Sequence, residues 1–171
     1  VHGCVISVDR LGGMEYWTLE QAFSESSSTT FSSFSSSASR LPFQFKSDTD
    51  LYALAMAKTR PIGLCQSPDH RFFAVTSTDR QIRVYRSESA KLYRQYDESL
   101  ATLSSSQKGE RAAIDDVEFG RRLAVEREIE KIQSQTTNTT ASSHLVLHDA
   151  LFDESGHFLL YATMYGVKVV N

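Results

Sequence analysis

The chain has 171 residues, a hydrophobic fraction of 40% and a formal net charge of −3 at neutral pH. These values predict one folded domain with a substantial apolar core. The balance of charge does not favour binding to nucleic acid, and no apolar run approaches the roughly 20 residues that span a bilayer. Cys4 and Cys65 each lie in an apolar run, so we expect reduced core thiols in an intracellular compartment.

Residues 1–20 predict a partial antiparallel unit. Ser7-x-Asp9 leads through Gly12-Gly13, which ease a turn, into a short apolar strand that ends at Trp17. Residues 21–42 hold a Ser-rich insertion, in which ten of the sixteen residues from Ser24 to Ser39 are serine. Such a run cannot bury enough apolar surface to offset its ordering entropy, so we expect it to be disordered.

Residues 43–97 predict a short helix followed by four strands. The helix is expected from Asp48 to Met56, with Ser47 and Asp50 at capping-box spacing. Strands are expected at 62–66, 72–77, 82–85 and 91–96, because turn-forming residues separate short apolar runs. Ser77-x-Asp79 precedes the strand that ends at Tyr85, which repeats the arrangement seen in residues 7–17.

Residues 98–143 predict an insertion that contains a charged helix over 114–132. Val125, Ile129 and Ile132 follow helical spacing, and Phe119 with Leu123 makes a second apolar pair. Residues 115–131 carry six acidic and four basic side chains, a balance that disfavours binding to phosphates. The apolar stripe is also too short for a stable coiled coil. We therefore expect this helix to lie on a protein surface.

Residues 144–171 contain a third copy of the strand–turn–strand unit. FDESGHFLLYATMYGVKVVN aligns with QSPDHRFFAVTSTDRQIRVY, with one gap. Repeated four-stranded units of this kind are typical of WD40 β-propellers. The predicted fold is mainly β, a partial WD40-type β-propeller with an inserted α-helix. About two and a half blades are visible, so we expect a partial sequence. The expected structural, non-catalytic WD40 positions are Ser7, Asp9, Trp17, Ser77, Asp79 and Tyr85, with Tyr85 replacing the usual tryptophan.

Other candidate sites are weaker. His144, His148, Asp149 and Asp153 lie close together in sequence, but no Cys or Glu completes a metal site at standard spacing. No phosphate-binding loop or nucleophile motif is present in the sequence. We therefore expect no catalytic, cofactor-binding or metal-binding residues. Arg121 and Arg122 are a possible partner surface, with pairing to Glu118 and Glu126 as the alternative.

The segments KSDTDLYAL, QSPDHRFFAVTSTDRQIRVYR, KLYRQYDESL and VEFGRRLAVEREIEK occur in this order, followed by the C-terminal repeat. Together they closely resemble the WD40 region of the peptidyl-prolyl isomerase domain and WD repeat-containing proteins, the multidomain cyclophilins. The resemblance implies a nuclear, spliceosome-associated protein whose partners are proteins. It also implies a separate cyclophilin domain with a pocket of Arg, Phe, Gln and Trp, and those motifs do not occur here. The alternative is a stand-alone WD40 scaffold, such as a ligase substrate receptor, with no attached isomerase.

Overall fold

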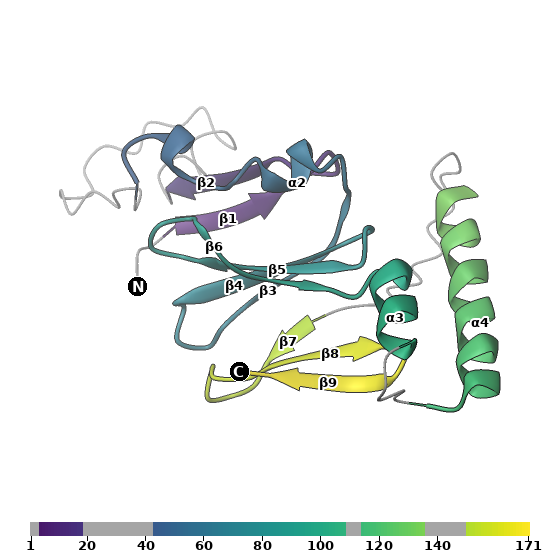
Figure 1. Cartoon of the computed structure of the whole chain (residues 1–171). Helices are drawn as coiled ribbons and strands as arrows, with labels where there is room; N and C mark the ends of the chain where they lie inside the picture. The colour runs from purple at the N-terminus through teal and green to yellow at the C-terminus, as the bar shows by residue number, and fades with distance from the viewer. Residues whose placement is uncertain (1–3, 19–42, 109–113, 136–149) are drawn as a thin grey trace, which may run out of the picture.

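Three antiparallel β-sheets form the body of the molecule, shown in Figure 1. The computed structural model describes residues 4–18, 43–108, 114–135 and 150–171, without the side chains of 133–135. In every sheet each strand pairs with the next one along the chain, so the described part is mainly β. The strands of the three sheets are β1 (Cys4–Val8) and β2 (Met14–Thr18); β3 (Pro61–Gln66), β4 (Phe72–Ser77), β5 (Gln81–Arg86) and β6 (Leu92–Asp97); and β7 (Ala150–Phe152), β8 (Leu159–Thr163) and β9 (Gly166–Val170).

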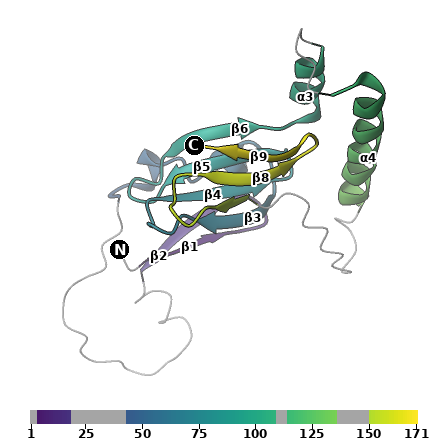
Figure 2. The same ribbon diagram turned by 90° about the horizontal axis from the view of Figure 1, so that it is seen from below.

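The middle sheet confirms the four strands predicted between residues 62 and 96, within one residue at each end. Its two central strands, β4 and β5, are buried on both faces, because the other sheets lie above and below them (Figure 2). One face contributes Phe73, Val75 and Tyr85 to a cluster with Met14, Tyr16, Leu51, Leu54 and Ala90. The other face contributes Ala74, Ile82 and Val84 to a cluster with Ala150, Leu159 and Tyr161.

The predicted helix over residues 48–56 is wrong in its extent and in its cap. The structure has a 3-10 turn, η1 (Lys46–Asp48), and a single helical turn, α2 (Ala53–Met56). No side chain caps α2, and Asp50 accepts a 2.7 Å bond from the backbone N–H of Leu92. The carboxylate that was expected in a capping box therefore ties this segment to β6.

Helix α3 (Leu100–Gln107) lies in the predicted insertion over 98–143, ahead of its charged helix. Its N-cap is Ser99, whose hydroxyl accepts a bond from the N–H of Thr102. Ser104 donates to the carbonyl of Leu100, one turn earlier. The Ser99 cap therefore satisfies one of the N–H groups that the first turn of a helix leaves without a partner, and Ser104 satisfies its own hydroxyl on the helix backbone.

Helix α4 (Asp116–Gln135) confirms the charged helix predicted over 114–132, displaced by two to three residues. It lies beside the ends of the strands (Figure 1). Phe119 stacks on Tyr165 of the β8–β9 turn, with ring centroids 6.3 Å apart. Val125, in the middle of the helix, remains more than half exposed. The Ser-rich run at 24–39 lies outside the described residues, as do residues 136–143 of the predicted insertion.

Candidate functional site

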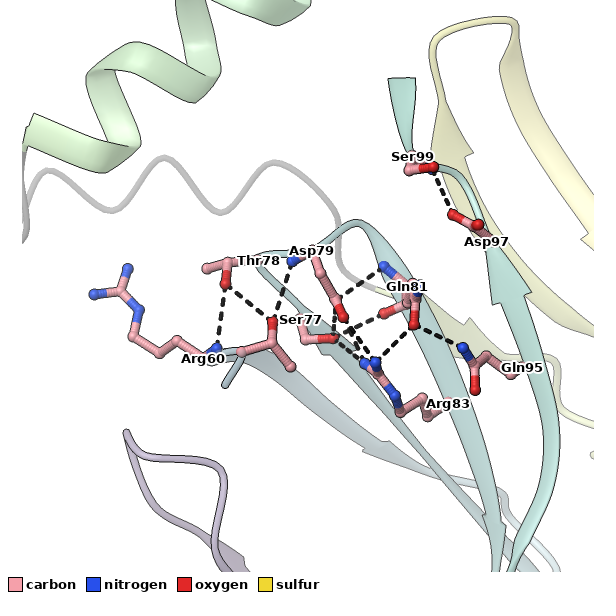
Figure 3. A network of polar contacts seen from close by, with 10 residues as sticks. Arg60, Ser77, Thr78, Asp79, Gln81, Arg83, Gln95, Asp97 and Ser99 are labelled. Atoms are coloured by element: carbon pink, nitrogen blue, oxygen red, sulfur yellow. Dashed lines mark hydrogen bonds and ion pairs between the residues drawn. The ribbon is translucent and has the colours of Figure 1, made fainter. Parts of the chain in front are cut away.

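A network of polar side chains closes the β4–β5 turn, shown in Figure 3. Ser77 ends β4 and donates a 2.6 Å bond to Asp79, and Asp79 accepts from the backbone N–H of Gln81. Arg83 reaches back from β5 and donates to Ser77 at 2.6 Å and to Asp79 at 2.7 Å. It also donates to the side-chain oxygen of Gln81. The network supplies partners for polar groups that the turn would otherwise leave buried.

Asp79 is ionised within this network. Burial raises its pKa, but the bonds from Arg83 and Ser77 and the positive charge of Arg83 outweigh that effect, and the pKa lies below its ordinary value. The side chain of Arg83 is 5% exposed and that of Asp79 is 28% exposed. The group is thus a half-buried ion pair that braces a turn.

The β1–β2 hairpin contains a related arrangement, in which a tryptophan rather than an arginine donates to the serine. Asp9 accepts bonds from the backbone N–H groups of Leu11 and Gly13, at 2.8 and 2.7 Å, and so caps the β1–β2 turn. The indole of Trp17 donates a 2.7 Å bond to the hydroxyl of Ser7. Ser7, Asp9 and Trp17, the three predicted side chains of this hairpin, therefore all form hydrogen bonds at or beside the β1–β2 turn.

Arg83, and not Tyr85, is the equivalent of Trp17 in the middle sheet. Trp17 lies opposite Val5, two residues before the serine of its turn. Arg83 lies opposite Val75, which is also two residues before Ser77. Ser7 and Trp17 are ten residues apart, whereas Ser77 and Arg83 are six apart, because the β1–β2 turn is four residues longer. The spacing in the sequence pairs Trp17 with Tyr85, which lies two residues further along β5.

Tyr85 packs in the hydrophobic core. Its ring stacks on Phe73, with centroids 5.0 Å apart and planes inclined by 11°. The residue is fully buried, and that burial raises its pKa to about 12. Its hydroxyl has no hydrogen-bond partner, so it donates no bond to Ser77 or Asp79.

The third sheet places Lys168 at the same cross-strand position. Lys168 lies opposite Tyr161 on β8, and the aligned pair in the middle sheet is Arg83 and Val75. Its ammonium group donates a 2.6 Å bond to Glu98, which follows β6 of the neighbouring sheet. Tyr161 donates to the same carboxylate oxygen at 3.0 Å. This contact joins the second and third sheets at their ends.

Arg80 connects the β4–β5 turn to helix α4. Its guanidinium donates to the carboxylates of Glu130 at 3.0 Å and Glu126 at 2.8 Å, and to the carbonyl of Glu126 at 3.4 Å. The side chain of Arg80 is 8% exposed. Its φ is +59°, a left-handed conformation that is costly for a residue with a Cβ. No local pattern in the sequence indicates this contact, because the partners lie 46 and 50 residues away.

The two predicted partner-surface arginines have different environments. Arg121 is exposed and pairs with Glu118 at 3.1 Å. Arg122 pairs with Glu118 at 2.9 Å and also donates to the carbonyl of Met164 at 3.0 Å. Arg122 thus fastens α4 to the β8–β9 turn, whereas Arg121 faces outward. Glu126, the other expected partner, binds Arg80.

The described residues offer few groups for chemistry. Among them no three His, Cys, Asp or Glu side chains are grouped to hold a metal ion. His144, His148 and Asp149 lie outside the described range, and Asp153 accepts bonds from its own turn. Cys4 and Cys65 form no disulfide and pack against different core clusters. None of the helices in the described segments is long and apolar enough to cross a membrane.

A cleft of about 200 Å³ lies between the second and third sheets. Its walls are mainly aromatic and aliphatic, with Arg94, His157 and Asn171 as polar members. The rings come from Phe72, Tyr93, Tyr96 and Phe152. The guanidinium of Arg94 already lies over the ring of Tyr93 and donates to the carbonyl of Asn171. The cleft contains no tryptophan or glutamine side chain among its described walls.

The chain resembles curated proteins along its whole length. It is 38% identical over 174 residues to the human peptidylprolyl isomerase domain and WD repeat-containing protein 1, an alignment that covers all of this chain. It is 40% identical over 171 residues to the peptidyl-prolyl cis-trans isomerase cyp15 of Rhizopus delemar, and 36% identical to CYP71 of Arabidopsis thaliana. These proteins are homologues of the chain. A scan against models of known protein families finds no match.

The chain spans about a quarter of the length of these relatives: 23% of the human protein and 24% of the fungal one. The names of the relatives describe peptidyl-prolyl isomerases, and one name also describes WD repeats. The similarity is therefore to one segment of longer proteins.

Proposed function

We propose that this chain is a WD40-type propeller segment that binds partner proteins within a peptidyl-prolyl isomerase, and that the chain is not itself the catalyst. The proposal rests on one cross-strand position that recurs in each of the three sheets. Trp17, Arg83 and Lys168 take that position in three successive sheets, and the sheets stack face to face. Such stacking of successive antiparallel sheets is how propeller blades bury their faces.

The polar clusters of the described residues support a structural role. Ser77, Asp79 and Arg83 satisfy one another, and their bonds leave no general base poised beside a reactive nucleophile. The cleft between the sheets has an arginine and a phenylalanine, but it lacks the tryptophan and glutamine that the resemblance implies for an isomerase pocket. Trp17, the single tryptophan of the sequence, is bonded to Ser7 at the first hairpin.

A prolyl-isomerisation assay on the 171-residue chain tests the non-catalytic role. We expect no acceleration of cis–trans exchange in a proline-containing peptide above the uncatalysed rate, which corresponds to tens of seconds or longer. A cyclophilin assayed in parallel is the positive control, and Arg94→Ala checks the cleft. A rate enhancement that Arg94→Ala abolishes would place the isomerase site in this chain and refute the proposal.

We further propose that the parent protein is nuclear and acts with spliceosomal proteins, as the resemblance in residues 116–131 implies. Imaging of the tagged full-length protein and its co-purification with splicing particles test this role. A cytoplasmic distribution with no splicing component recovered would contradict it. The alternative, a WD40 scaffold without an isomerase, is distinguished by the reading frame of the parent gene, which must encode a cyclophilin domain under our proposal.

A further inference from the structure

The β1–β2 turn packs directly on helix α2. Gly12, in this turn, is buried, and a Cβ at its position would lie 2.8 Å from the Cβ of Leu54 and 2.9 Å from the backbone nitrogen of Ala55. Leu54 is itself fully buried in the core cluster that includes Met14. Figure 1 shows the same arrangement, with the turn beside α2 at one end of the first sheet. The turn and the helix are therefore held at a fixed separation.

Two large apolar side chains beside this contact are exposed to solvent. Leu11 precedes Gly12 in the turn, and Met56 is the last residue of α2. Each is 81% exposed, the highest value among the large hydrophobic side chains that the structure describes. The close approach of Gly12 to α2 limits the distance between the Cα atoms of Leu11 and Met56 to about 13 Å, the span of roughly four extended residues. A single exposed leucine is ordinary, but two such side chains at this spacing can be covered by one short peptide segment.

The same two segments carry an excess of basic side chains. The β1–β2 turn and the segment from α2 to β3 hold three bases, Arg10, Lys58 and Arg60, and one acid, Asp9, a net charge of +2. Arg10 and Lys58 are exposed, and Figure 3 shows Arg60 extending away from the polar network of the β4–β5 turn. Within the described part of the chain, none of the three bases forms an ion pair. The adjacent β4–β5 turn differs, because its charged side chains are held in ion pairs with one another and with α4.

Leu11 and Met56 together with these three bases are called the turn patch. We propose that the turn patch binds a short acidic segment of a partner protein that carries large apolar side chains. This inference rests on the proposed role in protein binding and assigns that role to one surface. Acidic residues on the partner would neutralise bases that have no counter-charge in the described residues, and would select the orientation of the segment.

The composition of the turn patch favours a protein over the two other classes of anionic partner. A single-stranded nucleic acid gains affinity by stacking its bases on aromatic rings, whereas the apolar members of this patch are aliphatic. An anionic membrane binds through a broader apolar face, such as one side of an amphipathic helix, and α2 has a single turn. Because Gly12 and Leu54 fix the two segments, the chain orders little of itself on binding.

Fluorescence anisotropy with labelled synthetic peptides measures this binding on the 171-residue chain. The first peptide has about ten residues, enough to span both apolar side chains, with two leucines set between glutamates. The second has lysine in place of each glutamate, and the third has serine in place of each leucine. We expect the first peptide to bind at least about tenfold more tightly than either of the others. Salt at about 300 mM should reduce its advantage over the lysine peptide by screening.

Two pairs of identical substitutions provide matched controls. Leu11→Ser removes an apolar member of the turn patch and should weaken binding of the first peptide by about fivefold or more, whereas Leu151→Ser, at a leucine of β7 that is 62% exposed, should leave the affinity unchanged. Lys58→Gln should weaken binding by about threefold, whereas Lys131→Gln on α4 should not. Circular dichroism confirms that all four variants are folded.

Three results would overturn the inference: no binding of the first peptide, equal binding of all three peptides, or equal losses from Leu11→Ser and Leu151→Ser. Tighter binding of phosphatidylserine vesicles or of a single-stranded RNA oligonucleotide than of the first peptide would also overturn it. None of these results depends on the isomerisation assay, so the turn patch can fail as a binding surface while the proposed non-catalytic function stands.

Discussion

Replacing Arg83 by methionine tests the brace at the β4–β5 turn. Methionine retains an apolar stem but removes the donors that reach Ser77, Asp79 and Gln81 at 2.6, 2.7 and 2.6 Å. Breaking a fully buried ion pair costs about 3–5 kcal/mol. Asp79 is 28% exposed, and solvent therefore screens part of the lost interaction. We expect Arg83→Met to reduce the free energy of unfolding by about 2–3 kcal/mol.

Urea unfolding followed by far-ultraviolet circular dichroism measures this loss as a lower midpoint. Thermal melting should show a fall in Tm of about 5–10 °C for a chain of this size. The matched control is Arg121→Met, since Arg121 is exposed and its side chain pairs with Glu118 on the same helix. That control should change stability by less than about 0.5 kcal/mol.

The pH dependence of stability has a definite sign. The folded pKa of Asp79 lies below its unfolded value of about 4, so the unfolded state binds more protons in this range. The contribution of Asp79 is fully present above pH 4 and is lost as the pH falls through the folded pKa. We expect Asp79→Asn to lack this part of the acid dependence of the wild type.

A double-mutant cycle between Arg83→Met and Asp79→Asn isolates their interaction. We expect a coupling energy of about 1–2 kcal/mol for a partly exposed, hydrogen-bonded pair. A coupling near zero, or a loss from Arg83→Met no larger than that from Arg121→Met, would show that the network is not a brace. Arg83 would then occupy the same cross-strand position as Trp17 without stabilising its turn.

Three other predictions follow from the contacts. Arg80→Gly relaxes the strained φ of +59° but removes the ion pairs with Glu126 and Glu130 that hold α4. Limited proteolysis should therefore cut within α4 faster than in the wild type, and equal rates would show that these ion pairs do not hold the helix. Gly12→Ala should destabilise the chain by about 1–3 kcal/mol, because its Cβ would lie 2.8 Å from that of Leu54 at a φ of +86°; Gly120→Ala, with open space around it in α4, should instead stabilise by up to about 1 kcal/mol in urea unfolding. Trp17→Phe retains an aromatic ring but loses the indole donor, so a cost of about 0.5–1.5 kcal/mol is expected by thermal melting, and no cost would mean that the bond contributes nothing net.

The strands of the middle sheet were predictable because their turns carry local signals. Ser67 and Asp69 bond to each other and to the backbone between β3 and β4, and Ser77 with Asp79 repeats this between β4 and β5. A short side chain that caps its own turn acts within a few residues. Such contacts can be read from spacing alone.

Contacts across the chain could not be read in the same way. Arg80 lies 46 residues before Glu126, and Asp50 lies 42 residues before Leu92. The partner of Asp50 shows why the predicted capping box failed, since a carboxylate that binds a distant strand is no longer available to its own helix.

The exchange of tryptophan for arginine at one cross-strand position has a consequence for how sequences of this kind vary. Both side chains serve as a donor to serine, but arginine also brings a positive charge, which the carboxylate of Asp79 neutralises. Tryptophan brings none, which leaves Asp9 to cap its turn alone. We therefore expect the two kinds of residue to be inherited with different neighbours: arginine together with an acid four positions earlier, tryptophan with a longer, glycine-containing turn. A sequence search that requires an aromatic residue at this position would miss the arginine form. A search that accepts either a tryptophan or an arginine with an acid four residues earlier would find both forms.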